Sequence, residues 1–177
     1  KYGGTSETLY APAYAENREQ KVAFMQNATV KQTLDLARKA DVALVGIGDM
    51  SENSYMVDLG WFTPDEVVQS RLMQGVVGDF AGYDFFDIHG DVANTVMSDR
   101  VIGLGIEEFR PIAEVIAIAA ENSKPLALLG ALRTGAIDVI ATSVSNALTV
   151  LNLDEQMHGN STSAVSYTHL TLPTIPG

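Results

Sequence analysis

Apolar and polar residues follow one another along the chain in blocks that predict strands and helices in turn. The most informative block is the apolar run 42–45, which breaks into Gly46-Ile47-Gly48 and then Asp49. A run without alternation and with frequent β-branched residues is typical of a strand buried on both faces. The glycines let the backbone turn sharply at the carboxyl end of this strand and approach another group closely. Ligands of open α/β sheets bind at that end, so the stretch predicts either a ligand-binding turn or a plain tight turn.

A short strand and two helices are expected before this run. Residues 8–11 predict a strand that Pro12 stops. A helix is expected from Glu16. The stretch 29–32 has the form of a capping box, in which a Thr hydroxyl and a Gln side chain satisfy orphan amides. It predicts a second helix that runs to Ala40.

The segment after the run predicts a loop followed by a well-defined helix. Residues 51–60 are polar and indicate a loop near the carboxyl edge of the sheet. Thr63 is placed as an N-cap, Pro64 as the first helical residue and Glu66 as the acid of a capping box. The helix is expected to end near Gly75.

Two short β segments, 76–80 and 83–86, flank Ala81 and Gly82 and predict a hairpin whose register the sequence does not define. Aromatic residues are frequent in and before this hairpin and are more typical of a core than of a platform for stacking on a sugar. They are Trp61, Phe62, Tyr83, Phe85 and Phe86.

The last third has the clearest α/β rhythm. Strands at 115–119 and 136–141 alternate with helices at 124–133 and 143–151, and Gly135 is placed to end the first of these helices in the left-handed conformation. This alternation implies parallel strands joined by right-handed crossovers. The apolar stripes expected to be buried are Leu126, Leu129 and Leu132 on the first helix and Val144, Leu148 and Leu151 on the second.

The regular pattern ends after Asn152, which sets the expected boundary of the domain. We expect a domain over 1–153, truncated at its amino end because the chain opens at Lys1 without Met. The remaining 154–177 is expected to be a disordered or artefactual tail. From about Val165 it resembles a translated sequencing adapter and continues no element.

Composition and charge exclude several kinds of partner. The 177 residues carry a net charge of −11, which disfavours contacts with nucleic-acid phosphates or with an anionic membrane surface. The chain has no cysteine, so disulfides and thiolate metal sites are excluded, as fits a cytoplasmic protein. No apolar run has the length of a membrane span.

Three charged residues are candidates for chemistry. Asp49 and Asp79 each stand beside a glycine at the end of an apolar run, where a carboxylate accepts sugar hydroxyls, acts as a general base or simply makes a turn. Lys124 opens a predicted helix and is either solvated or, with the helix amides, part of an anion site. No histidine has a partner at a recognisable spacing and no dinucleotide fingerprint is present, so neither a metal nor a cofactor is expected.

Several stretches together resemble the effector-binding domain of the SorC/DeoR-like bacterial regulators of sugar metabolism. The matching segments, in family order, are 40–48, 75–79, 85–87 with Gly90, 100–103, 115–117 and 131–142. The resemblance covers about residues 9 to 151, and the ordered set is far more specific than any single motif.

The resemblance implies a fold, a ligand and partners. The fold is α/β and Rossmann-like, with a mostly parallel sheet and helices on both faces, similar to that of sugar-phosphate isomerases and deaminases. Members bind phosphorylated sugars at the strand ends and form dimers or tetramers. They contact DNA through an amino-terminal helix-turn-helix, which is absent here, as is the family's first strand with its Gly-rich phosphate loop.

The resemblance also assigns roles to individual residues. Asp79 matches the aspartate that faces the ligand, and Lys124 matches the lysine that meets its phosphate. Gly46 and Gly48 match the close-approach loop, and Tyr14 lies where a lining residue is expected.

The sequence departs from the family pattern at one place and leaves three functions open. Ser143-Val144 stands where the family has Asp-Glu, although Ser143 can still cap a helix. A ligand sensor without catalysis is the favoured hypothesis. A sugar-phosphate isomerase or deaminase with Asp79 or Asp49 as general base is the alternative, but it lacks an evident partner acid. An oligomerisation module with a decayed pocket is the third possibility.

Overall fold

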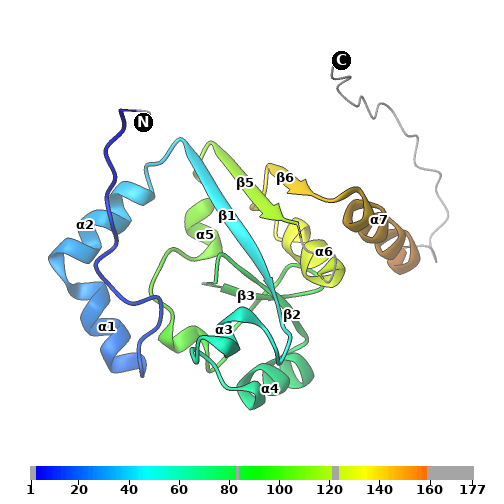
Figure 1. The fold of residues 1–177 in the computed structure, drawn as a ribbon, viewed down its shortest axis with the longest axis horizontal. Helices are drawn as coiled ribbons and strands as arrows, with labels where there is room; N and C mark the ends of the chain where they lie inside the picture. Colours follow the sequence, from blue (N-terminus) through cyan, green and yellow to red (C-terminus); the bar gives the residue numbers. More distant parts are fainter. Residues whose placement is uncertain (1–2, 83, 121–123, 159–177) are drawn as a thin grey trace.

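The computed structural model describes residues 3–82, 84–120 and 124–158, which form one mixed six-stranded sheet with helices around it (Figure 1). The strands are β1 (Val42–Asp49), β2 (Val76–Phe80), β3 (Asp84–Asp87), β4 (Val92–Ala93), β5 (Glu114–Ala119) and β6 (Val139–Thr142). Their order across the sheet is β4-β3-β2-β1-β5-β6. The α/β expectation is confirmed. Parallel pairing joins β1, β5 and β6, whereas β2, β3 and β4 extend the sheet antiparallel.

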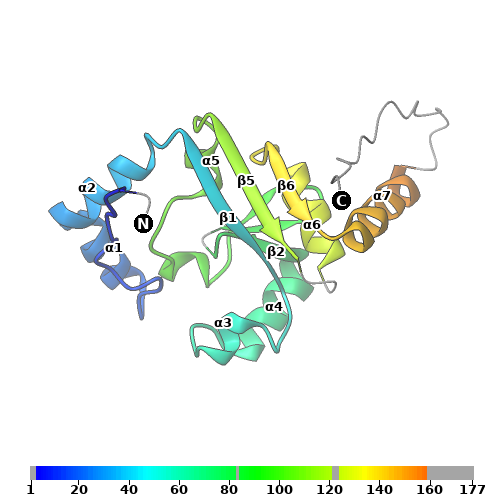
Figure 2. The same cartoon turned by 45° about the horizontal axis from the view of Figure 1, so that its top comes forward.

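Helices lie on both faces of the sheet, as expected. They are α1 (Arg18–Gln26), α2 (Ala28–Ala37), α3 (Tyr55–Asp58), α4 (Pro64–Gln74), α5 (Ile106–Phe109), α6 (Pro125–Arg133) and α7 (Val144–His158), with a 3₁₀ turn η1 (Ser98–Arg100). Two neighbouring residues of β3 belong to the two cores on opposite faces of the sheet. Phe86 packs with α2, α5, α6 and α7 in one core cluster, and Phe85 packs with α3 and α4 in another. In Figures 1 and 2, α3 and α4 lie close to the carboxyl end of β1.

The parallel half of the sheet is covered on one face only within the described residues. Along β1, Val45 and Ile47 are buried, but Leu44 is 67% exposed. Ile118 of β5 and Val139 of β6 are exposed on the same face as Leu44. The expectation that β1 is buried on both faces is therefore wrong. The helices on that face, α3 and α4, cover the antiparallel strands instead.

The predicted buried stripes of the last two helices are also largely wrong. Of the six residues named, Leu129 alone is buried, and Leu126, Leu132, Val144, Leu148 and Leu151 are exposed. In α6 the buried face is built from small residues, because a Cβ on Gly130 would lie 2.6 Å from the carbonyl oxygen of Asp87. This close contact turns the small residues of the helix toward the sheet and leaves Leu126 and Leu132 exposed. In α7, which packs on α6, the buried residues are Asn146 and Val150.

Three local expectations at the ends of the chain need correction. Residues 8–11 form no strand, since Tyr14 makes an isolated bridge to Val101 instead. The cap of α2 is Asn27, whose side chain accepts from the amides of residues 29 and 30, so the box at 29–32 does not form and the helix ends at Ala37. Helix α7 continues to His158, beyond the end expected at Leu151, and 159–177 lie outside the described residues.

The capping box of α4 is confirmed and gives a first prediction. Thr63 Oγ1 accepts the Glu66 amide at 3.2 Å, and Glu66 accepts the Thr63 amide at 2.8 Å. Thr63→Ala should therefore lower the free energy of unfolding by about 1 kcal/mol. Urea denaturation measures this, with Thr29→Ala as the matched control because Thr29 is exposed and is not the cap of α2. Equal losses in the two variants would contradict the role of this cap.

Candidate functional site

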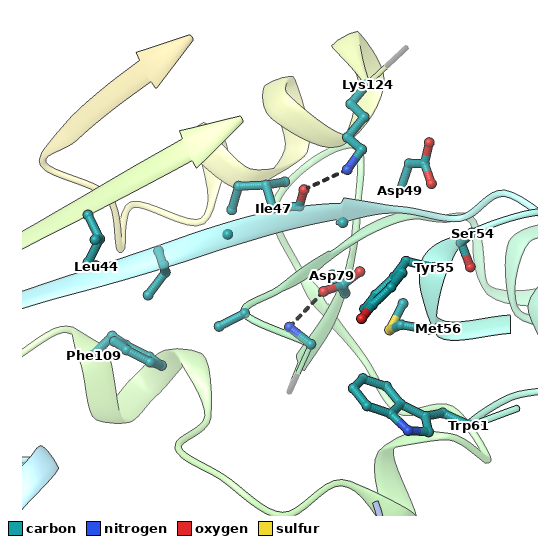
Figure 3. Close-up of a pocket in the computed structure, with 15 residues that line it drawn as sticks. Leu44, Ile47, Asp49, Ser54, Tyr55, Met56, Trp61, Asp79, Phe109 and Lys124 are labelled. Atoms are coloured by element: carbon teal, nitrogen blue, oxygen red, sulfur yellow. Dashed lines mark hydrogen bonds between the residues drawn. The ribbon is translucent and has the colours of Figure 1, made fainter. Parts of the chain in front are cut away.

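A cavity of about 580 Å³ opens at the carboxyl end of β1, between the antiparallel and parallel halves of the sheet (Figure 3). It lies where ligands of open α/β sheets bind. Residues 44–49 of β1 form one side of it. The segment around α3 and α4 contributes Ser54, Tyr55, Met56 and Trp61, and the β2–β3 hairpin contributes Asp79, Ala81 and Gly82. The remaining lining residues are Phe109 of α5 and Lys124.

Five of the six predicted site residues line this cavity: Gly46, Gly48, Asp49, Asp79 and Lys124. The sixth, Tyr14, is not among the lining residues. Its hydroxyl donates to the carbonyl oxygen of Gly82 at 2.5 Å, and its ring lies against Trp61 with centroids 4.7 Å apart. Tyr14 therefore contacts lining residues, Met56 among them, without itself lining the cavity.

The carboxyl group of Asp79 is placed by strand pairing. Asp79 of β2 is the register partner of Gly48 of β1, so its side chain crosses the strand over a residue without a Cβ. A Cβ on Gly48 would lie 1.7 Å from Asp79 Oδ2. The amide of Gly82 donates to Asp79 Oδ1 at 2.7 Å. The carboxyl is thus held between β1 and the hairpin turn.

The electrostatics of Asp79 are unusual for a carboxyl group. The residue is 3% exposed. Burial raises the pKa of Asp79 to about 6, because it disfavours the charged form. The Gly82 amide and the Lys124 ammonium lower this pKa in part, and the Asp49 carboxylate adds to the increase.

Two buried side-chain oxygens have no hydrogen-bond partner among the residues that the structure describes, and both belong to the cavity lining. They are Ser54 Oγ and Asp79 Oδ2. Buried polar groups in folded proteins are nearly always paired, and exceptions call for an explanation. A bound molecule with hydroxyl groups would satisfy both oxygens, because a hydroxyl donates to a carboxylate and exchanges a bond with a serine.

The opposite side of β1 carries a cation at a helix start. Lys124 is the N-cap of α6, and its ammonium donates to the carbonyl oxygen of Ile47 at 3.3 Å. Figure 3 shows Lys124 and Asp79 on either side of the β1 ribbon, with Asp49 at its end. A helix start and an ammonium together favour a bound anion. Lys124 and Asp49 also line a second cavity of about 470 Å³, together with Arg71.

The sequence interpretation missed the lining residues that α3 contributes. Ser54 and Tyr55 fall in the stretch 51–60, which was expected to be a loop, and Trp61 was assigned to the core. The available signal was position, since this stretch directly follows the carboxyl end of β1. The role of Ser143 in capping is confirmed, as its hydroxyl accepts the amide of Asn146 at 3.1 Å.

Within 3–82, 84–120 and 124–158, no cluster of three or more His, Cys, Asp or Glu side chains is arranged to hold a metal ion. No helix in the same ranges is long and apolar enough to cross a membrane.

Comparison with known proteins assigns the family. The family model described as "Putative sugar-binding domain" matches residues 1–152. The chain belongs to this sugar-binding domain family. Together with the relatives described next, this match confirms the resemblance to SorC/DeoR-like transcriptional regulators.

Relatives of this sugar-binding domain include solved and curated regulators. The solved sugar-binding domain of a transcriptional repressor from Vibrio fischeri is 59% identical with a TM-score of 0.81, over 88% of this chain and 61% of that one. The full-length sorbitol operon regulator SorC from Klebsiella pneumoniae is 26% identical with a TM-score of 0.69, over 78% and 45%. Transcriptional regulator LsrR from Escherichia coli K12 is 30% identical over 80% of this chain. The chain spans 45% of the length of LsrR.

Proposed function

We propose that this sugar-binding domain senses a phosphorylated sugar and controls a repressor of carbohydrate metabolism, without catalysing a reaction. The observation that carries the proposal is the pair of unpartnered buried oxygens, Ser54 Oγ and Asp79 Oδ2, in a cavity that Lys124 also lines. The oxygens suit sugar hydroxyls, and the ammonium at the start of α6 suits a phosphate. Tyr55 and Trp61 offer aromatic surface to the sugar ring.

The ligand would act by shifting a conformational equilibrium. A phosphosugar that binds one arrangement of a dimer or tetramer more tightly than another would change the spacing of the DNA-binding parts. The net charge of −11 assigns DNA contact to another part of such a regulator, which would work in the cytoplasm. The relatives named above are transcriptional regulators, which supports a sensor over an enzyme.

A thermal-shift screen tests the proposal. Glucose 6-phosphate, fructose 6-phosphate and ribose 5-phosphate are compared with the free sugars and with inorganic phosphate. A molecule that binds only the folded protein raises the melting temperature by mass action. We expect one sugar phosphate to do so and its free sugar to act more weakly.

Substitution of Lys124 sharpens the result. Lys124→Ala should weaken binding of the active sugar phosphate by about ten- to 100-fold, because a hydrogen bond to a charged group is lost. Lys39→Ala is the matched control, since Lys39 is exposed and does not line the cavity. If no sugar phosphate shifts the melting temperature, the sensor proposal is wrong. Chemical conversion of the stabilising compound would favour the enzyme, in which Asp79 or Asp49 would serve as the base.

A further inference from the structure

We propose that Asp79 couples effector binding to proton release: a ligand hydroxyl donates to Oδ2 of the ionised carboxylate, so acidification weakens binding. This inference rests on the proposed function and concerns the regulation of the same site. It starts from geometry. Asp79 Oδ1 already accepts the Gly82 amide, and Oδ2 is buried without a partner among the described residues.

The surroundings of the carboxyl decide which form the ligand selects. Lys124 approaches from α6 and stabilises the ionised form, and Asp49 at the end of β1 opposes it. The Gly82 amide of the hairpin donates to Oδ1 and also favours the ionised form. The Tyr14 phenol from the amino-terminal segment is directed to the Gly82 carbonyl. On the β3 side, the register partner of Asp79 is the uncharged Phe85.

The ionised carboxylate is the better partner for a ligand hydroxyl. A hydrogen bond from a hydroxyl to a carboxylate is charge-assisted and stronger than one between neutral groups. Protonated Asp79 would instead hold a proton for which Oδ2 has no acceptor among the described residues. A phosphate on the ligand would raise the pKa of Asp79, but Lys124 and the start of α6 compensate its charge. The hydrogen bond from the ligand hydroxyl therefore has a larger effect on the pKa of Asp79 than the ligand phosphate has.

The coupling falls in an accessible range of pH. Because burial raises the pKa of ligand-free Asp79 to about 6, a large fraction of the carboxyl is protonated at pH 5.5 and little at pH 7.5. A ligand that requires the carboxylate must then displace that proton. By linkage, its dissociation constant rises by up to about ten-fold for each pH unit below 6.

The experiment is calorimetric titration with whichever of the three sugar phosphates the thermal screen selects, between pH 5 and 8. Two buffers with different ionisation enthalpies are used, so that proton release is measured directly. The phosphate of the probe itself titrates near pH 6. Asp79→Asn is therefore measured alongside, since its amide oxygen still accepts a hydroxyl but carries no proton to release. Asp65→Asn, an exposed acid of α4, is the matched control.

We expect the wild type and Asp65→Asn to release more protons than Asp79→Asn between pH 5 and 6.5, and to lose more affinity on acidification. The pH dependence that remains in Asp79→Asn belongs to the probe. Equal proton release in the wild type and in Asp79→Asn would overturn the inference while leaving the sensor intact. If no sugar phosphate binds at any pH, the proposed function itself fails. Carboxyl-carbon NMR of Asp79 gives an independent check, because its pKa must fall when the probe binds.

Discussion

Truncation of Phe86 to alanine should destabilise the protein by about 3–5 kcal/mol, the range typical of a buried phenylalanine. Phe86 lies on β3 and is fully buried. Its ring fills the space that two glycines leave. A Cβ on Gly78 would lie 2.9 Å from the ring, and one on Gly130 would lie 3.0 Å from it. Because α6, β2 and β3 all meet at this ring, little collapse into the vacated volume is expected.

The cross-strand neighbour of Phe86 supplies the control for that measurement. Val92 of β4 is its register partner and is 49% exposed. Val92→Ala should lower the free energy of unfolding by less than about 1 kcal/mol, since exposed positions contribute little. Urea denaturation of both variants with unchanged slopes gives the comparison. Similar losses in the two variants would mean that the contact between α6 and the sheet is not the centre of the core.

Local signals in the sequence predicted several turns and helix ends, although the capping box expected at 29–32 does not form. The capping box at Thr63, the helix end near Gly75 and the left-handed conformation of Gly135 depend on a few adjacent residues, and all three occur as expected. The hairpin after β2 was also predicted, and in the structure Ala81 and Gly82 at its turn have positive φ. These features follow from backbone chemistry that acts within one turn of the chain.

Features that depend on packing were not predictable in the same way. Periodicity placed the leucines of α6 inside, but the close approach of Gly130 to β3 decided the orientation of the helix. The alternation of strands and helices in the last third predicted parallel pairing, which β5 and β6 show, but it gave no sign that the hairpin pairs with β1 antiparallel. Asp79 was named from its place beside a glycine at the end of an apolar run and from the family resemblance. That its Oδ2 lies over Gly48 without a partner depends on strand register, which no sequence pattern defined.

The buried carboxyl of Asp79 opposes folding at neutral pH. Its pKa rises from 3.8 to about 6, so the folded protein binds the proton more tightly than the unfolded chain. The stability that this proton contributes is fully present below about pH 4 and is lost as the pH rises through 6. Two pKa units correspond to roughly 3 kcal/mol. A group that opposes folding by this amount is typical of a binding site, where strain and unpaired groups are kept for the ligand.

Gly48→Ala should weaken sugar-phosphate binding while Lys124 and the cavity remain. The new Cβ would lie 1.7 Å from Asp79 Oδ2 and 2.6 Å from its Cγ, so the carboxyl must leave its place over β1. Its hydrogen bond from the Gly82 amide is lost with it. We expect about ten- to 100-fold weaker binding, as for loss of a hydrogen bond to a charged group. Overpacking should also lower stability by about 1–3 kcal/mol.

A double-mutant cycle isolates this cause. In an Asp79→Ala background the carboxyl is gone, so Gly48→Ala should have little further effect on stability or on binding. Gly46→Ala is the control for strand β1 itself, because a Cβ on Gly46 would meet no atom within 4 Å and should leave the free energy of unfolding nearly unchanged. Additive losses for Gly48→Ala and Asp79→Ala would show that the two residues act separately. A strong deviation from additivity would establish that Gly48 is required at this position in order to accommodate the carboxyl of Asp79.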